Sequence, residues 1–218
     1  MTDQQTLRIT VFGATGNIGR LVIDQLLADG HTVTAYVRNP AKLTVSHPNL
    51  TVVQGQLDDT AAIARAVAGA DAVISTLGPS LRRGAKGSPV ADGTRTIINA
   101  MQQAGVRRYI GLATPAVADR RDRPTPKGKL LRLMPRLAFP NALTELDGMT
   151  DAVTTSGLDW TIARITSPND KPAKGTTRAG FLGRDSVGSA MTRTDIAAFL
   201  TEQLTDTTYL DAAPAISN

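Results

Sequence analysis

The stretch that most constrains the fold of this chain is residues 7–19, LRITVFGATGNIG. Six residues with the pattern of a β-strand run into Gly13, Gly16 and Gly19, and the apolar residues that follow have the spacing of one buried helix face. The first glycine permits a tight turn, the second lets the backbone approach a pyrophosphate, and the third lets helix and strand pack closely. Unpaired amides and the positive end of the helix dipole would face the phosphates. We therefore predict a dinucleotide site here, the alternative being a purely structural turn.

The residue after the second expected strand indicates which dinucleotide is bound. Residues 32–37 form that strand, and Arg38 follows at about the distance from the glycine turn at which such folds place the residue that contacts the adenosine ribose. An acid there would accept hydrogen bonds from a free 2′-hydroxyl, whereas a guanidinium suits a 2′-phosphate in shape and charge. The sequence thus favours NADP(H) over NAD(H). The alternative is a solvated arginine that opens the turn before Pro40.

Strand and helix patterns alternate along the whole chain. Further strands are expected at residues 50–54, 70–76, 106–113, 158–165 and 208–213, and further helices after residue 59, over 89–103 with Ser88 as N-cap, over 144–155 and after residue 192. This alternation predicts a doubly wound, mainly parallel sheet with helices on both faces, a Rossmann-like α/β fold. Because no linker or repeat divides the chain, we expect one domain over residues 1–218.

The composition argues against several classes of protein. Without cysteine there are no disulfides or thiolate sites, and His31 and His47 are both expected to be solvated loop residues, so no metal site is predicted. No apolar run approaches the ~20 residues of a membrane span. The start of the chain lacks the basic run of a signal peptide. We therefore expect a cytoplasmic protein with no membrane partner.

The net charge of +5 comes from one segment. Between residues 119 and 136, two acids, Asp119 and Asp122, stand against seven bases: Arg120, Arg121, Arg123, Lys127, Lys129, Arg132 and Arg136. The helix and strand periodicity fails over residues 116–140, which predicts a lid-like insertion on the substrate side. One amphipathic helix is expected within it, limited by Pro135 and with its apolar face formed by Leu130, Leu133, Met134 and Leu137. The charge could attract acidic substrates or simply be solvated and mobile. Nucleic-acid binding is disfavoured, because the basic run contains no aromatic residue for base stacking.

Several segments together resemble a known family. GATGNIG at 13–19, AYVRNP at 35–40, GADAVISTLG at 69–78, GVRRYI at 105–110 and SGLDWTIAR at 156–164 occur in order. They are similar to the atypical short-chain dehydrogenase/reductase group of NAD(P)H-binding proteins, which includes the NADPH-dependent flavin/biliverdin-IXβ reductase and is related to the NmrA-like redox sensors. The resemblance covers nearly the whole chain and is weakest over residues 116–145. It implies a fold more firmly than an activity, because one fold hosts many functions.

The resemblance also implies a set of binding residues, taken position by position. Gly13, Thr15, Gly16, Asn17 and Ile18 would contact the pyrophosphate, Arg38 the 2′-phosphate, Gln56 and Leu57 the adenine, and Thr76, Leu77 and Gly78 the ribose side. Thr114 would lie near the nicotinamide, where the family usually has serine, and Ile165, Thr166 and Ser167 would border the carboxamide. Gln56 stands where the family often has an acid, which weakens the adenine contact.

One departure from the family concerns the chemistry. Typical short-chain dehydrogenases protonate the substrate oxygen with a tyrosine, assisted by a lysine four residues later on the same helix face. No lysine follows Tyr36, Tyr109 or Tyr209 at that spacing, and all three are expected to be strand packing residues. The helix position where many relatives carry lysine is Asp147. A conventional Tyr–Lys alcohol dehydrogenase is therefore excluded; Thr114 remains a candidate to orient a carbonyl, with a local hydrogen bond at the strand end as its alternative role.

Two functions remain open on these residues. The first is an NADPH-dependent reductase of a flat conjugated acceptor of the flavin, quinone or tetrapyrrole type, which can take a hydride while solvent supplies the proton. The second is a non-catalytic protein that senses NADP(H) and binds a protein partner through residues 129–139. A monomer or a weak homodimer is compatible with either.

Overall fold

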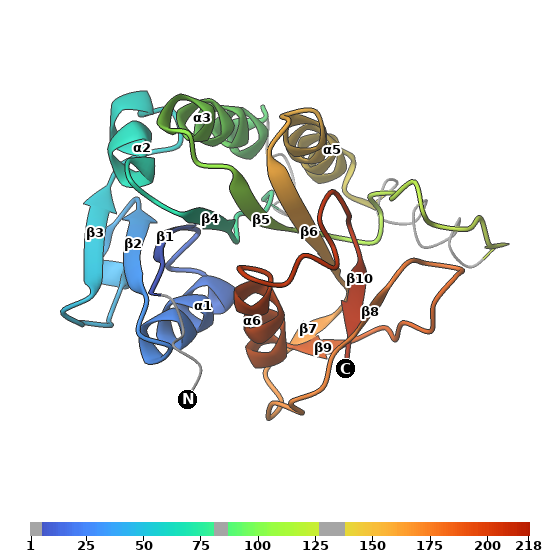
Figure 1. Cartoon of the computed structure of the whole chain (residues 1–218). Coiled ribbons are helices and arrows are strands. Elements are labelled where there is room, and N and C mark those ends of the chain that lie inside the picture. The colour runs from blue at the N-terminus through green and yellow to red at the C-terminus, as the bar shows by residue number, and fades with distance from the viewer. Residues whose placement is uncertain (1–5, 81–86, 127–137) are drawn as a thin grey trace.

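The computed structural model of the chain describes residues 6–80, 87–126 and 138–218. Its centre is an eight-stranded sheet in the order β3-β2-β1-β4-β5-β6-β10-β8 (Figure 1). The strands are β1 Arg8–Phe12, β2 Thr32–Val37, β3 Leu50–Gln54, β4 Ala72–Ser75, β5 Arg108–Ala113, β6 Asp159–Ile165, β8 Arg178–Gly180 and β10 Ala215–Ser217. All neighbours pair in parallel except β10 and β8, which are antiparallel. The predicted mainly parallel, doubly wound fold is confirmed.

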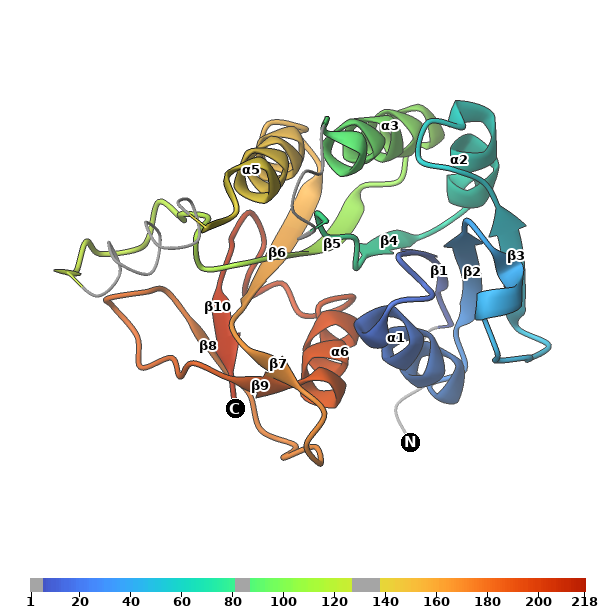
Figure 2. The ribbon, with the colours of Figure 1, turned by 180° about the vertical axis from the view of Figure 1, so that it is seen from behind.

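Helices cover both faces of this sheet (Figures 1 and 2). One layer contains α2 Thr60–Val67, α3 Pro89–Ala104 and α5 Pro140–Thr154, and the other contains α1 Asn17–Ala28 and α6 Arg193–Glu202. Each layer buries its own apolar cluster against the sheet. The central strand β4 is buried at every position, as expected of a parallel strand covered on both sides. A short 3-10 helix, η1 Pro40–Lys42, and a small parallel pair, β7 Pro168–Asn169 with β9 Met191–Thr192, complete the elements.

The ends of two helices show how local sequence sets their limits. The Thr192 hydroxyl accepts a hydrogen bond from the Asp195 amide at 3.1 Å, so a side-chain cap sets the start of α6, the helix predicted after residue 192. In contrast, α5 begins four residues before its predicted start, at Pro140. A proline suits this first helical position because its missing N–H would have no partner there.

The last strand was predicted in the wrong place. Residues 208–213 form a turn instead, in which Asp211 adopts a left-handed conformation with φ of 50°. The turn contacts β6 through the bridge between Thr161 and Ala212, through the Asp211 amide, which donates to Trp160 O at 2.8 Å, and through Tyr209 O, which accepts from the Thr161 hydroxyl at 2.9 Å. The strand that completes this side of the sheet is β10, a few residues later.

Two single-residue predictions also need correction. His31 is buried, and its Nδ1 accepts a hydrogen bond from the Leu7 amide at 3.2 Å, whereas His47 is exposed as expected. Tyr36 and Tyr109 are buried strand residues as predicted. Tyr209 instead lies in the turn after α6, where its hydroxyl donates to Ala179 O at 3.2 Å.

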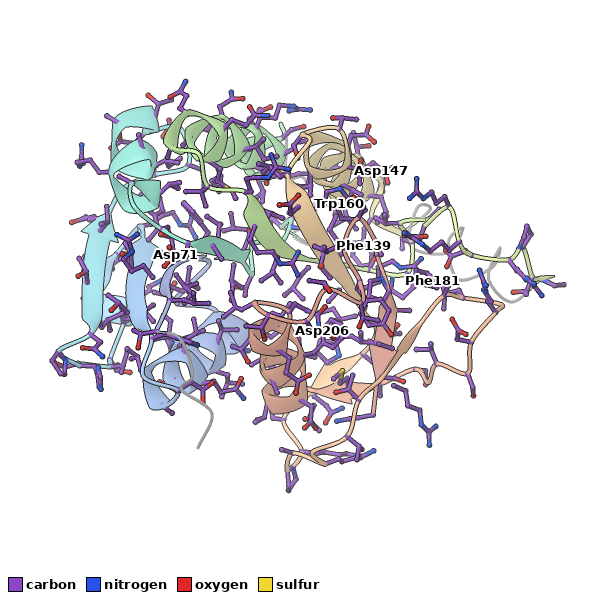
Figure 3. All side chains as sticks on the ribbon, in the orientation of Figure 1. Asp71, Phe139, Asp147, Trp160, Phe181 and Asp206 are labelled. Atoms are coloured by element: carbon purple, nitrogen blue, oxygen red, sulfur yellow. The ribbon has the colours of Figure 1, made fainter. Side chains whose placement is uncertain are left out.

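The first part of the basic insertion is packed against the sheet and is not a solvated loop. Arg164 of β6 forms a two-pronged ion pair with Asp122, with N–O distances of 2.7 and 2.8 Å, and the side chains are 0% and 3% exposed. Asp119 is also buried and accepts a hydrogen bond from the Ala213 amide at 2.8 Å. Arg121 lies over the Phe181 ring, which Figure 3 labels, at 5.3 Å from its centre. The expected amphipathic helix, with Leu130, Leu133, Met134 and Leu137, and the bases Lys127, Lys129, Arg132 and Arg136 lie outside the described residues.

Among the described residues, no helix has the length and apolar character needed to cross a membrane. Nor does any group of three or more potential metal ligands come together within that part of the chain.

Candidate cofactor site

A cleft of about 670 Å³ opens at the carboxyl ends of the central strands. The register of the sheet explains its position: Phe12, the last residue of β1, lies level with Tyr36 of β2 and Ser75 of β4, so the segments that follow meet at one edge. The cleft is bordered by the β1–α1 turn, the end of β2, the loop after β4 and the first turns of α3 and α5. Eight of the predicted binding residues line it: Gly13, Thr15, Gly16, Arg38, Leu57, Thr76, Leu77 and Gly78.

The glycine turn is tight because two of its glycines touch the neighbouring strand. Gly13 has a left-handed φ of 77°, and a β-carbon there would lie 2.6 Å from Thr76 Oγ1. A β-carbon on Gly19 would meet the same hydroxyl at 2.8 Å. Thr76 Oγ1 itself lies 3.1 Å from Phe12 O and 3.2 Å from Gly13 O. Thr76, predicted as a ribose contact, thus also holds the turn in shape.

Gly16 differs from the other two glycines because its surroundings are open. It is the N-cap of α1, and the one heavy atom of the described chain that a β-carbon there would approach within 4 Å is Gly13 O, at 3.2 Å. No side chain caps α1 and its first turn carries no acid. By comparison, α2 is capped by the Asp59 carboxylate, which accepts from the Ala62 amide at 2.9 Å. The start of α1 therefore offers amides to an anion in the cleft.

Arg38 lines the cleft at the end of β2 and is exposed. Its guanidinium forms no ion pair with any described residue, and its backbone carbonyl accepts a hydrogen bond from Gln54 Nε2 at 3.4 Å. The next residue, Asn39, shapes the turn, because its side chain accepts from the Ala41 amide at 3.1 Å. The positive charge of Arg38 thus remains available to a ligand.

The two residues expected to contact the adenine differ in their position relative to the cleft. Leu57 lines the cleft and packs against α3, where a β-carbon on Gly93 would lie 2.6 Å from Leu57 Cβ. Gln56 is exposed and does not line the cleft, but its carbonyl accepts a hydrogen bond from the Tyr36 hydroxyl at 2.7 Å. Tyr36 itself lines the cleft, a contact that the sequence analysis missed.

The remaining predicted residues do not border this cleft. Asn17 and Ile18 are the first residues of α1, Ile165 is the last residue of β6, and Thr166 and Ser167 follow it. Thr114 is exposed at the end of β5, where its Oγ1 accepts a hydrogen bond from the Ala116 amide at 3.3 Å. The local bond considered for Thr114 is therefore present. The catalytic role of Thr114 and the binding roles of the other five residues stay predictions.

The tyrosines of the two central strands are poorly suited to donate a proton. Burial raises the pKa of Tyr109 to about 12. Burial, reinforced by the charge of Asp59, also raises the pKa of Tyr36 to about 12. Asp147, where many relatives carry lysine, is half-buried on α5 (Figure 3) and does not border the cleft.

The wall formed by α3 and α5 contains a carboxylate that sequence reasoning missed. Glu145 is buried on α5, lines the cleft, and accepts a hydrogen bond from the Val90 amide in the first turn of α3. This carboxylate caps α3, whereas the predicted N-cap Ser88 forms no side-chain cap. Asn141 and Ala142 line the cleft from the same helix face, since residues three and four apart lie side by side. The predicted start of α5 at residue 144 excluded them.

Comparisons with known proteins point to one family. The NAD(P)H-binding family matches residues 13–207. A 3-beta-hydroxysteroid dehydrogenase of Mycolicibacterium neoaurum is 34% identical over 120 residues, which cover 50% of this chain and 32% of that protein. A (4-alkanoyl-5-oxo-2,5-dihydrofuran-3-yl)methyl phosphate reductase of Streptomyces griseus is 36% identical over 111 residues, 51% of this chain and 36% of that one. The chain thus spans about a third of the length of these relatives.

Solved structures match over nearly the full length. A short-chain dehydrogenase/reductase from Veillonella parvula in complex with NADP superposes with a TM-score of 0.77 at 19% identity, covering 98% of this chain and 95% of that one. ChuY, an anaerobillin reductase from Escherichia coli O157:H7, has a TM-score of 0.78 at 23% identity and covers 96% of both chains. With the glycine turn, the cleft and this match over residues 13–207, the chain belongs to the NAD(P)H-binding family.

Proposed function

We propose that this chain is an NADPH-dependent reductase of a flat, conjugated acceptor of the flavin, quinone or tetrapyrrole type. One observation carries the proposal: a single cleft brings together the glycine turn, the uncapped start of α1 and the available guanidinium of Arg38. Anions are stabilised at a helix start by unpaired amides and the helix dipole. A carboxylate or a neutral side chain at position 38 would lack the charge that a 2′-phosphate requires.

Each residue predicted from the sequence is given a role in binding NADPH. Thr15, Asn17 and Ile18 bind the pyrophosphate together with Gly13 and Gly16, and Arg38 selects the 2′-phosphate. Gln56 and Leu57 hold the adenine, and Thr76, Leu77 and Gly78 border the ribose. Thr114 follows β5, Ile165 ends β6, and Thr166 and Ser167 follow β6. We place the nicotinamide and the acceptor at these carboxyl ends.

The choice of acceptor follows from the chain's lack of a suitable acid. The bound cofactor supplies a hydride. Tyr36 and Tyr109 both have a pKa raised to about 12, and neither they nor Tyr209 has a lysine four residues later. A conjugated acceptor needs no protein acid because solvent protonates it after reduction. Thr114 would orient the acceptor, and the basic charge around Arg120 and Arg123 would attract acidic ones.

The first test is a calorimetric titration with NADPH and NADH. We expect tighter binding of NADPH, and we expect Arg38→Ala to weaken NADPH binding about 10- to 100-fold, because a hydrogen-bonded charge pair contributes roughly 1.5–3 kcal/mol. Binding of NADH by this variant should change little. Arg107→Ala is the matched control, since this exposed arginine pairs with Asp159 at the opposite end of the strands. Equal affinities of the unmodified protein for the two cofactors would contradict the role of Arg38.

The second test is oxidation of NADPH with a panel of flavins, quinones, linear tetrapyrroles and simple carbonyls. Turnover with a conjugated acceptor, and none with simple carbonyls, is the expected result. Trp160 is a poor reporter of binding, because it lies near the start of β6 in a separate cavity of about 540 Å³ (Figure 3). Tight NADPH binding without oxidation by any acceptor would instead support the sensing function, whose expected surface, residues 129–139, lies mostly outside the described residues.

A further inference from the structure

The wall of the cleft opposite Arg38 holds a buried acid that the proposed reaction does not use. Glu145 is 5% exposed, although its side chain borders the same cleft as Gly13 and Thr76. Its Oε1 accepts a hydrogen bond from the Val90 amide, which ties α5 to the first turn of α3. Burial of an acid carries a desolvation cost, so its position at the surface of a ligand cleft calls for a chemical explanation.

The chemistry of a carboxylate narrows what it can bind. In its ionised form Glu145 only accepts hydrogen bonds, and two oxygens provide about four acceptor positions. The Val90 amide is its one hydrogen-bond donor among the described residues. A phosphate would be repelled, so the fitting ligand groups are hydroxyls and N–H groups. A dinucleotide offers such donors mainly on its two riboses.

The order of the sheet indicates which ribose lies near Glu145. Arg38 follows β2, the glycine turn follows β1, and Thr76 follows β4, so these segments succeed one another across the sheet. In Figure 1, α5 lies on the far side of this series, over β5 and β6, with α3 between it and α2. A dinucleotide with its adenosine half at Arg38 and its pyrophosphate at α1 therefore has its second ribose toward the α3 and α5 wall.

We propose that the Glu145 carboxylate accepts hydrogen bonds from the hydroxyls of the nicotinamide ribose. This inference rests on the proposed cofactor site and extends it to a residue that no family pattern supplies. Asn141 lines the cleft four residues earlier on the same face of α5. Typical family members place their tyrosine and lysine four residues apart on one helix face, whereas this chain presents an amide and an acceptor. Glu145 is thus a binding residue that positions the nicotinamide half, without a role as an acid.

The test compares ligands that contain or lack the second ribose. Glu145→Gln keeps an oxygen that can accept from the Val90 amide but removes the charge. We expect this variant to bind NADPH and NADH about tenfold more weakly than the unmodified protein, the loss of one charge-assisted hydrogen bond. Its affinity for 2′,5′-ADP, which contains only the adenosine half, should be unchanged. Arg38→Ala should show the reverse pattern, with weaker binding of 2′,5′-ADP and NADPH but not of NADH.

Asp151→Asn is the matched control, because it removes the same charge from an exposed position of the same helix. Its affinity for all three ligands should equal that of the unmodified protein. A second measurement needs no variant at all: an NADPH analogue without hydroxyls on the nicotinamide ribose should bind the unmodified protein about tenfold more weakly than NADPH. Glu145→Gln should then lose no further affinity for that analogue, since both changes remove the same interaction.

Distinct results separate failure of this inference from failure of the proposed function. If the unmodified protein prefers NADPH but Glu145→Gln binds all ligands equally well, the role of Glu145 is wrong and the cofactor site stands. A loss of 2′,5′-ADP affinity equal to the loss of NADPH affinity would also overturn it, because Glu145 would then only shape the cleft. If the unmodified protein binds neither cofactor, the proposed function itself is overturned.

Discussion

Two glycines of the same turn have different physical tasks. Gly13 is required by the backbone, since it combines a left-handed φ with a β-carbon position 2.6 Å from Thr76 Oγ1. Gly16 is less constrained, because its φ is −76° and the atom of the described chain that a β-carbon there would approach is Gly13 O, at 3.2 Å. Because Gly16 has no side chain, the start of α1 stays accessible to a phosphate. Mutations at the two positions should therefore separate folding from binding.

We expect Gly13→Ala to lower the free energy of unfolding by at least about 1–2 kcal/mol, the cost of a left-handed conformation in a residue with a β-carbon. Gly16→Ala should lower it by about 0.5–1 kcal/mol, because alanine is a poorer N-cap than glycine. It should nevertheless weaken NADPH binding by tenfold or more, a loss of about 1.4 kcal/mol. Urea unfolding and calorimetry measure the two quantities. NADPH binding by Gly16→Ala at the unmodified affinity would disprove the close approach of a phosphate.

At the scale of the element, the first part of the basic insertion depends on one buried ion pair. Asp122 receives two hydrogen bonds from Arg164 and one from the Leu182 amide at 2.9 Å, so β6, the insertion and the segment after β8 meet at this carboxylate. Arg164 also donates to Val117 O at 3.0 Å. The insertion is therefore held against the sheet as far as residue 122.

Breaking this pair should be costly because it leaves a buried charge without a partner. We expect Asp122→Asn to lower the free energy of unfolding by about 3–5 kcal/mol. The double variant Asp122→Leu with Arg164→Met, which removes both charges, should lose less than Asp122→Leu alone. Denaturant unfolding of the single and double variants forms the cycle. Additive losses would mean that the two groups do not stabilise each other.

The same carboxylate should make stability depend on pH. Burial is the largest single influence and acts to raise the pKa of Asp122, but the hydrogen bonds from Arg164 and from the Asp119 and Leu182 amides, with the charge of Arg164, together outweigh it and leave the pKa below its ordinary value of 3.8. Because the folded pKa is the lower one, the stabilisation is complete above the ordinary value and is lost as pH falls through the folded value. Between about pH 5 and pH 2 the unmodified protein should therefore lose more stability than Asp122→Asn. Parallel pH profiles of the two proteins would refute this contribution.

At the scale of the whole molecule, one sheet runs without interruption from β3 to β8 between the two helix layers. Residues from both halves of the chain share each apolar cluster, as Val22 of α1 and Leu200 of α6 do. The two halves should consequently unfold together. We therefore expect residues 1–218 to behave as one cooperative domain.

Thermal unfolding should thus show a single transition that NADPH moves upward. At a free NADPH concentration 100 times its Kd, binding to the folded state alone adds about 2.7 kcal/mol. For a chain of this size that corresponds to a rise in Tm of roughly 5–10 °C. Scanning calorimetry with and without NADPH makes the measurement, and NADH at the same concentration is the control. Two separate transitions would contradict the single domain.

Much of this architecture could be predicted from local patterns. The predicted strands at 32–37 and 50–54 coincide with β2 and β3, because alternating β-branched residues between turn signals depend little on distant contacts. The β1–α1 turn was equally clear, since the glycine triplet has a strand pattern before it and a helix pattern after it. The cap of α6 is local too, because the Thr192 hydroxyl and the Asp195 amide that it binds are three residues apart.

The missed features depend on which segments meet in space. Residues 208–213 were expected to form the last strand, but the strand that pairs with the end of β6 is β10, through Ala215 and Ile216. Glu145, Asp119 and Asp122 look like ordinary surface acids in the sequence. Each is buried because an amide or a guanidinium from a distant segment satisfies it, and no periodicity records such a partner.

By itself the sequence determined the fold class, the glycine turn and the order of most elements, because each follows from residues within a few positions of one another. Only the tertiary structure decided which walls enclose the cleft, which acids are buried and where the insertion leaves the sheet. The physical reason is that burial of a polar group depends on the partner that replaces water, and that partner lies tens of residues away along the chain.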